Sequence, residues 1–182
     1  MRTNPFWPAG LAVLALSAGW VARPCLAAPA GTTTTRSSSP ALERFKALAG
    51  DWVSAEDGDM VKKGDLVSRY AVTANGSAVV ETLFPGSPHE MVTVYHAEGS
   101  DLVLTHYCTE GNQPRMRART PAGNRFDFAW DGGTNIDAAH DRHMHSATVD
   151  LVSADEIRSE WNEIAEGKPV LVARIHVVRR AR

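Results

Sequence analysis

The chain has few cysteines, few aromatic residues and little excess of either charge. Two cysteines in 182 residues cannot form the framework of a disulfide-rich scaffold. The chain has 19 Lys and Arg residues and 21 Asp and Glu residues, so it lacks the excess of positive charge that bulk nucleic-acid binding requires. With 43% hydrophobic and 22% charged residues, the composition excludes collagen-like and wholly disordered chains, and the length suits a single domain.

Long hydrophobic runs are also missing, and the short one near the start predicts export. Arg2 is followed by the apolar stretch 11–16 and by small residues at 27–30, a pattern typical of a secretory signal peptide. The apolar stretch is shorter than the roughly 20 residues of a spanning helix, so we expect no stable membrane span after signal removal. An uncleaved membrane anchor is the alternative. We predict a signal peptide at residues 1–30 and a periplasmic or secreted protein.

The residues after the predicted signal divide into a linker and a domain. Residues 31–40 are too polar to pack and are interpreted as a flexible linker, which leaves residues 41–182 as the folded domain. Removal of the signal removes Cys25, so Cys108 stands alone and cannot form an internal disulfide. The domain must therefore be stabilised by a packed core.

Alternating apolar residues predict a domain built almost entirely from antiparallel strands. One short helix is expected at residues 41–49, where Leu42, Phe45 and Leu48 recur at helical spacing. Beyond it, turn residues recur about every ten positions, which is the spacing of a sandwich or barrel. Strands are expected near Trp52 and at residues 67–72, 78–84, 91–96, 102–108, 115–120, 125–130, 144–152, 156–161 and 170–179. We predict an all-β fold, an up-and-down barrel of about nine or ten strands with a short N-terminal helix.

Several stretches resemble a known family. Residues 45–52, Phe-Lys-Ala-Leu-Ala-Gly-Asp-Trp, are similar to the short helix and Gly-x-Trp opening of lipocalin-like (calycin) barrels. Residues 89–96, the Leu-Thr-His-Tyr-Cys stretch at 104–108 and Gly-Asn-Gln-Pro-Arg-Met at 111–116 resemble an exported bacterial lipocalin-like family of unknown function. The resemblance implies a barrel whose lumen binds an apolar or amphipathic small molecule, and a few calycin relatives hold haem.

Strand alternation suggests which polar residues face the lumen. On 102–108 the even positions carry two leucines, so we expect His106 and Cys108 to point inward. Buried polar groups need partners, so they are expected to meet one another, water or the polar head of a ligand. We predict a ligand site formed by six residues: His106, Cys108, Arg115 and His145, with Asn112 and Gln113 at its rim.

The position of Arg115 is open between two interpretations. Inside the barrel, its guanidinium suits a ligand with a carboxylate or another polar head. Arg117 and Arg119 share its parity, however, and the three together would form a basic row on the exterior. Exterior arginines pair with Asp or Glu on the sheet surface.

Two alternative chemistries use the histidines and the cysteine. His143 and His145 share a side of one expected strand, and with His106 they suggest a haem or divalent-metal binder. His106, Tyr107 and Cys108 suggest a lipocalin-fold enzyme with an activated thiolate. Neither a phosphate loop nor a nucleophile elbow is present, so an enzyme has no motif in its favour. Our leading hypothesis is a small-molecule binder without a resident cofactor or metal, and a filled, structural barrel is a further alternative.

Overall fold

The computed structural model describes residues 39–119 and 123–181. The predicted signal peptide and nearly all of the predicted linker lie outside the described residues. The elements, in chain order, are α1 (Pro40–Lys46), β1 (Gly50–Ser54), β2 (Leu66–Thr73), the 3₁₀ turn η1 (Ala74–Gly76), β3 (Ala78–Leu83), β4 (Met91–Glu98), β5 (Asp101–Tyr107), β6 (Gln113–Ala118), β7 (Arg125–Thr134), β8 (His143–Ser153), β9 (Glu156–Ala165) and β10 (Lys168–Arg179).

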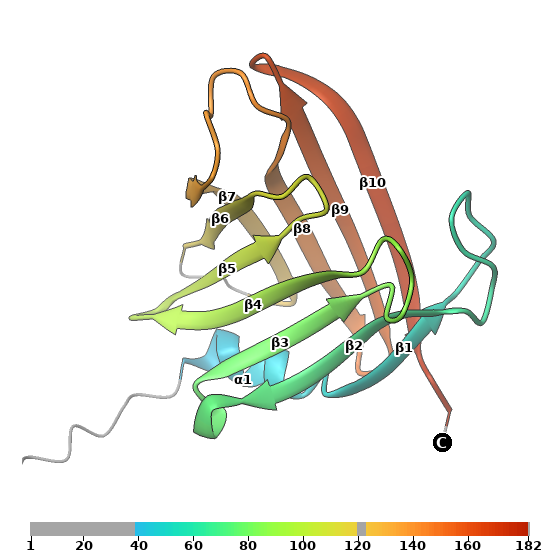
Figure 1. Cartoon of the computed structure of the whole chain (residues 1–182). Coiled ribbons are helices and arrows are strands. Elements are labelled where there is room, and N and C mark those ends of the chain that lie inside the picture. The colour runs from blue at the N-terminus through green and yellow to red at the C-terminus, as the bar shows by residue number, and fades with distance from the viewer. Residues whose placement is uncertain (1–38, 120–122, 182) are drawn as a thin grey trace, which may run out of the picture. The chain divides into compact units, whose positions relative to one another are not determined.

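The strands form one closed antiparallel barrel. Each strand pairs with the next along the chain, and β1 pairs with β10 to complete the circle. The predicted all-β, up-and-down barrel with a short N-terminal helix is therefore confirmed. Figure 1 shows α1 (blue) beside β2 and β3 at one end, whereas the β1–β2 and β3–β4 loops lie at the other.

The interior is set by the two-residue period of the strands. On β5 the buried Leu102, Leu104 and His106 share the inner face, as the even-position pattern predicts. Val103 is also buried, although it belongs to the other face. In β6 the inner face consists of Pro114, Met116 and Ala118. The residues between them point outward.

The end of the barrel next to α1 is filled by aromatic side chains. Phe45 of α1 is fully buried, and its ring lies 4.5 Å from the ring of Tyr95 and 5.0 Å from that of Phe126. The Nε1 of Trp52 donates a hydrogen bond to the carbonyl of Leu48 over 2.8 Å. The helix ends at Lys46, before the predicted end at Ala49, because the amides of Leu48 and Ala49 bond to carbonyls three residues back.

Arg179 stabilises the seam of the barrel, which is the pairing of the first strand, β1, with the last strand, β10. Only three residue pairs join β1 to β10, and Trp52 pairs with Arg179 itself. The guanidinium of Arg179 lies 4.4 Å from the Trp52 ring centroid and donates to the carbonyls of Ala47 and Ala49, each at 3.0 Å. It also donates to Asp155 in the β8–β9 turn over 2.9 Å. One side chain therefore links the end of α1, the seam and a neighbouring turn.

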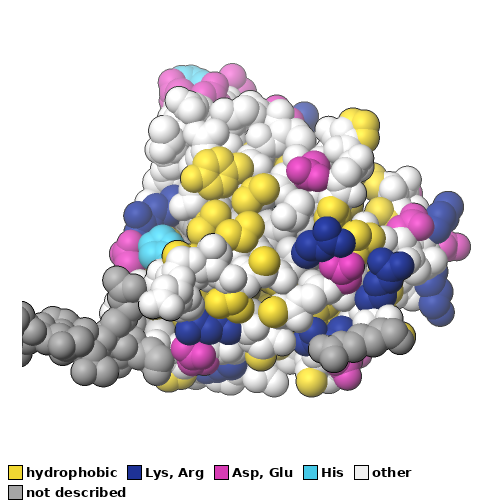
Figure 2. Space-filling model, turned by 60° about the horizontal axis from the view of Figure 1, so that its bottom comes forward, with side chains coloured by type: hydrophobic (Ala, Val, Ile, Leu, Met, Phe, Trp, Pro, Cys, Tyr) yellow, Lys and Arg dark blue, Asp and Glu magenta, His cyan; other side chains and the backbone are white. Residues whose placement is uncertain are grey.

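Charged side chains on the surface are placed next to charges of the opposite sign. Figure 2 shows Lys and Arg side chains (dark blue) beside Asp and Glu side chains (magenta) on the face it presents. Pairs such as Arg69 with Asp51 and Arg174 with Glu160 join neighbouring strands. No helix within the described residues is long and apolar enough to cross a membrane.

Candidate ligand cavity

A cavity of about 520 Å³ opens at the end of the barrel opposite α1. Its walls come from the ends of strands that meet there, including Val67 of β2, Leu83 of β3, Met144 of β8 and Trp161 of β9. The β1–β2 loop contributes residues 56–61. This volume lies within the range of about 300–1,000 Å³ that is typical of small-molecule sites. The barrel is thus filled with side chains at one end and hollow at the other.

The mouth of the cavity exposes apolar side chains to solvent. Met60 of the β1–β2 loop is 62% exposed, and Leu171 and Val172 of β10 are 46% and 39% exposed. All three line the cavity. An apolar molecule that enters would cover these side chains as well as the inner wall, and removing such surface from water favours binding.

His106 is the buried polar group of the cavity floor. Only 2% of the residue is exposed, and the residue lines the cavity. Its Nδ1 lies 2.9 Å from the hydroxyl of Thr93, and its ring packs against Trp161 with centroids 5.1 Å apart. Nε2 has no hydrogen-bond partner among the described residues. Burial lowers the pKa of His106 from 6.5 to about 4, so the imidazole is neutral at pH 7.

Cys108 also lines the cavity, but the residues proposed for an enzyme do not gather around it. Burial is the main cause that raises the pKa of the Cys108 thiol, which disfavours the reactive thiolate. Tyr107 is 49% exposed, and it belongs to the opposite face of β5 from His106. The expected cluster of His106, Tyr107 and Cys108 is therefore wrong as a single site, because neighbouring residues of a strand face opposite sides.

Asn112 and Gln113 shape the loop between β5 and β6 and do not line the cavity. The Nδ2 of the buried Asn112 donates to the carbonyl of Arg142 over 2.8 Å. The side chain of Gln113 bonds to Gly111 and to Asn135. Neither residue is among those that line the cavity. Asn112 instead ties this loop to the β7–β8 loop.

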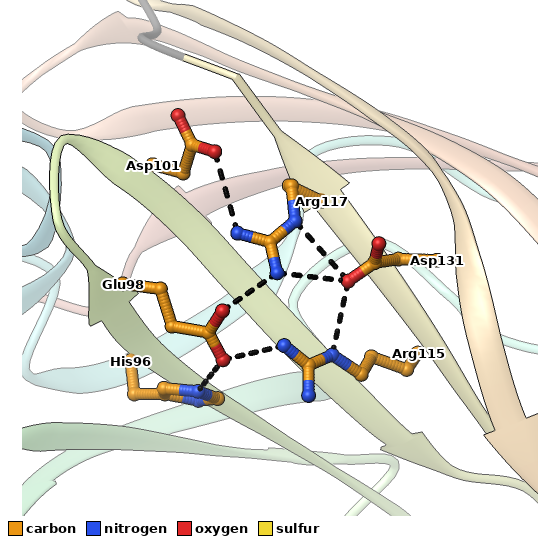
Figure 3. Close-up of polar contacts among 6 residues, drawn as sticks. All are labelled: His96, Glu98, Asp101, Arg115, Arg117 and Asp131. Carbon is orange, nitrogen blue, oxygen red and sulfur yellow. Dashed lines mark hydrogen bonds and ion pairs between the residues drawn. The ribbon is translucent and has the colours of Figure 1, made fainter.

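The expected interior position of Arg115 is wrong. Arg115 and Arg117 lie on the outer face of β6, where they join Glu98 of β4 and Asp131 of β7 in the cluster of Figure 3. Arg117 bonds to Asp101, Glu98 and Asp131 at 3.3, 2.6 and 3.0 Å. The alternative interpretation, an exterior row of arginines paired with acids, is the one the structure bears out for these two residues.

His145 does not face the cavity either. A bulge between Met144 and Ser146 places Met144 on the cavity wall, opposite Glu163 of β9. His145 stacks instead on Trp130 with ring centroids 5.2 Å apart, and its Nδ1 lies 3.4 Å from the Nε2 of His143. Within residues 39–119 and 123–181, no three His, Cys, Asp or Glu side chains come together in a group that could hold a metal ion.

The site predicted from the sequence did not include two buried carboxylates. Glu163 lines the cavity and pairs with Arg142, whose Nε lies 3.0 Å from its Oε2. Glu81 of β3 is buried and accepts hydrogen bonds from Ser68 and Tyr95 at 2.9 and 2.7 Å. Strand parity could have revealed Glu81, because it shares a face with Val79 and Leu83.

The chain matches no model of a known protein family, and a search among curated proteins found no match.

Proposed function

We propose that this protein binds one small, partly apolar molecule in the barrel cavity. One combined observation carries the proposal. The cavity has a volume of about 520 Å³, and Nε2 of His106, a residue of its wall, is buried without a hydrogen-bond partner among the described residues. A buried polar atom without a partner costs about 1–3 kcal/mol. A ligand group or a water molecule that bonds to Nε2 recovers this free energy.

The lining favours a ligand with an apolar body and few polar groups. Leu83, Met144, Trp161 and Ile175 offer apolar contact, whereas Glu163 is already paired with Arg142. His106 is neutral at pH 7 because burial lowers its pKa to about 4. The ligand thus meets these apolar side chains and the neutral imidazole of His106, whereas charged residues such as Glu56, Asp57 and Arg174 also line the cavity.

We further propose that the protein acts in the periplasm or outside the cell. The support is the signal-peptide pattern of residues 1–30. Membership of the exported lipocalin-like family stays a prediction based on the motifs at residues 104–108 and 111–116.

The binding function can be tested with the neutral fluorescent dye N-phenyl-1-naphthylamine. Ala173 of β10 lines the cavity, so Ala173→Phe adds bulk inside it. Ala71 of β2 is exposed, so Ala71→Phe is the same substitution on the outer surface. We expect saturable binding of one dye per chain, at least tenfold weaker in Ala173→Phe and unchanged in Ala71→Phe.

The natural ligand is accessible by mass spectrometry. Protein purified from the organism that makes it, kept under native conditions, is expected to carry a small molecule that organic solvent extracts. Absence of saturable dye binding, or equal binding by the Ala173→Phe and Ala71→Phe variants, contradicts the proposed function.

Haem is a second candidate ligand, favoured by one observation. An imidazole nitrogen without a partner is the type of atom that binds haem iron, and Nε2 of His106 is such an atom among the described residues of the cavity. Thr93 would fix the ring through Nδ1. Haem itself would supply redox or gas-binding chemistry. Titration with haemin should then give a shifted visible absorption band in the wild type and in Ala71→Phe but not in His106→Gln.

A further inference from the structure

The first half of β10 is a sheet edge that has no partner strand on one side, within the part of the chain that the structure describes. β9 pairs with β10 over most of its length, whereas β1 pairs only with residues 177–179. One more hydrogen bond, from the amide of Ala55 to the carbonyl of His176 over 3.0 Å, precedes the β1–β2 loop. Figure 1 shows β10 (red) continuing past the end of β1. Residues 168–175 therefore form a free edge.

The backbone groups on the free edge follow from the alternation along β10. The carbonyl of His176 points to β1, whereas the amide of Arg179 bonds to the turn between β8 and β9. Successive residues of an antiparallel strand direct their backbone groups to alternate sides, and the register with β9 is regular between these positions. Val172 and Arg174 therefore direct their N–H and C=O groups to the free side, where no described residue bonds to them.

The same edge exposes three successive apolar side chains. Val170, Leu171 and Val172 are all exposed to solvent. An edge with unpaired backbone groups and apolar side chains is a template for another strand. Lys168 and Pro169 limit this edge at one end, because proline has no N–H to donate, and the pairing with β1 limits it at the other. The free edge therefore fits one short strand.

We propose that this edge pairs, antiparallel, with the same edge of a second copy of the chain, about a two-fold axis at Val172. A two-fold axis brings one surface against itself, so the surface must complement itself. With Val172 opposite its own copy, the backbone groups of the two Val172 residues face each other, and Leu171 lies opposite the partner's Ala173. Leu171 and Ala173 both line the cavity, so the partner's Leu171 adds to the cavity wall. This inference goes beyond the proposed binding function and does not depend on it.

The charges on the edge favour a second copy in this register. Lys168 of one copy comes near His176 of the other. In each copy, His176 lies 3.0 Å from Glu156 and 3.6 Å from Glu56, so the incoming ammonium group meets two carboxylates. Lys168 has no ion pair or hydrogen bond with any described residue of its own copy. A register centred one residue earlier would instead bring Lys168 near Arg174, and like charges that face each other across strands are destabilising.

Sedimentation equilibrium of the mature chain tests the dimer. We expect a dimer whose dissociation constant is at least tenfold higher in Val172→Lys, because this change places two like charges opposite each other on the axis. Val152→Lys is the same change at a similarly exposed position of β8, which has a strand on both sides, and should alter the constant less than twofold. A wild type that remains monomeric at about 100 µM overturns the inference and leaves the binding function intact. An equal loss in the two variants also overturns it.

Disulfide cross-linking in a Cys108→Ser background tests the register. In Val172→Cys the two thiols lie opposite each other, within the Cα separation of about 4.4–6.8 Å that a disulfide spans. In Val170→Cys they lie four residues apart along the strands, roughly 13 Å, which is too far. We expect mild oxidation to give a covalent dimer in Val172→Cys and not in Val170→Cys. No cross-link in Val172→Cys, or equal cross-linking of the two variants, overturns the inference.

Discussion

The sequence prediction of the site depended most on two polar side chains, His106 on β5 and Arg115 on β6. For His106 the neighbouring leucines at 102 and 104 indicated the interior, and the structure confirms this. For Arg115 the alternation of Pro114, Met116 and Ala118 decides for the exterior. An arginine outside the barrel finds Glu98 and Asp131 in solvent-accessible surroundings, whereas inside it would need a buried counter-charge.

The buried imidazole makes stability depend on pH. The folded-state pKa of His106, about 4, is below the unfolded value of 6.5, so the unfolded chain binds a proton more readily between these values. The stability associated with neutral His106 is therefore complete above pH 6.5 and is lost as the pH falls toward 4, by about 3 kcal/mol. Urea unfolding at pH 7 and pH 4 should show a wild-type loss that is larger by about this amount than the loss in His106→Gln. Parallel losses in both proteins would contradict the assignment to His106.

The exterior cluster should be independent of the ligand cavity. Hydrogen bonds from Arg117, and then from Arg115, lower the pKa of Glu98 to about 2. We expect Arg117→Ala to return this pKa toward 4.5, as measured by carboxyl ¹³C NMR, while the affinity for N-phenyl-1-naphthylamine stays unchanged. Arg115→Ala should shift the Glu98 pKa less and also leave dye affinity unchanged. Weaker dye binding in Arg115→Ala would indicate that this arginine reaches the ligand after all.

Among the elements, the strands were predictable and the irregularities between them were not. Alternation predicted the strands β2 to β6, and on β5 it also predicted the inner face. On β6 it left the position of Arg115 open between the two faces. On β8 the bulge at Met144 to Ser146 puts Met144 on the cavity wall. His145 therefore does not lie on the same face as Ala147 and Val149, where simple alternation would place it. A bulge adds one residue to one strand and reverses the side that the residues beyond it face, and this sequence carries no turn residue to mark it.

The seam between β1 and β10 offers a test of how the barrel is held closed. Arg179→Ala removes the ring contact with Trp52 and the hydrogen bonds to Ala47 and Ala49. We expect the free energy of unfolding to fall by about 2 kcal/mol, the sum of a cation–π contact and partly exposed charged hydrogen bonds. Urea denaturation measures this change. Arg158→Ala, which removes an exposed pair with Glu156, is the control and should have little effect. Equal losses of unfolding free energy in the two variants would contradict a special role of Arg179 in closing the barrel.

For the whole molecule, the sequence predicted the closed barrel but not the hollow within it. A period of two residues specifies an inside and an outside, and turns at short intervals specify neighbouring strands. Which part of the inside is filled depends on side chains that meet from elements distant in the chain, such as Phe45 of α1 with Phe126 of β7 at one end and His106 of β5 with Trp161 of β9 at the other. These contacts join residues far apart in sequence, so no local pattern records them.

The predicted export of the protein is tested on the mature chain. If residues 1–30 are a signal peptide, the exported protein begins between about Ala28 and Gly31. Edman degradation of protein recovered from the periplasm or the medium of the producing organism gives this residue. Recovery of a chain that retains Met1 and remains in the cytoplasm would contradict the prediction.

Arg179 also determines when the barrel can form. Its partners Ala47, Ala49 and Trp52 lie about 130 positions earlier in the chain, as the separation of 130 residues between Arg179 and Ala49 shows. Strand pairs between neighbours form early and locally, but the circle cannot close until the ribosome has released the end of β10. Until then β1 presents an unpaired edge, which another strand could occupy. We therefore expect the nascent chain to depend on a chaperone, or on transport in an unfolded state, until its final strand has been made.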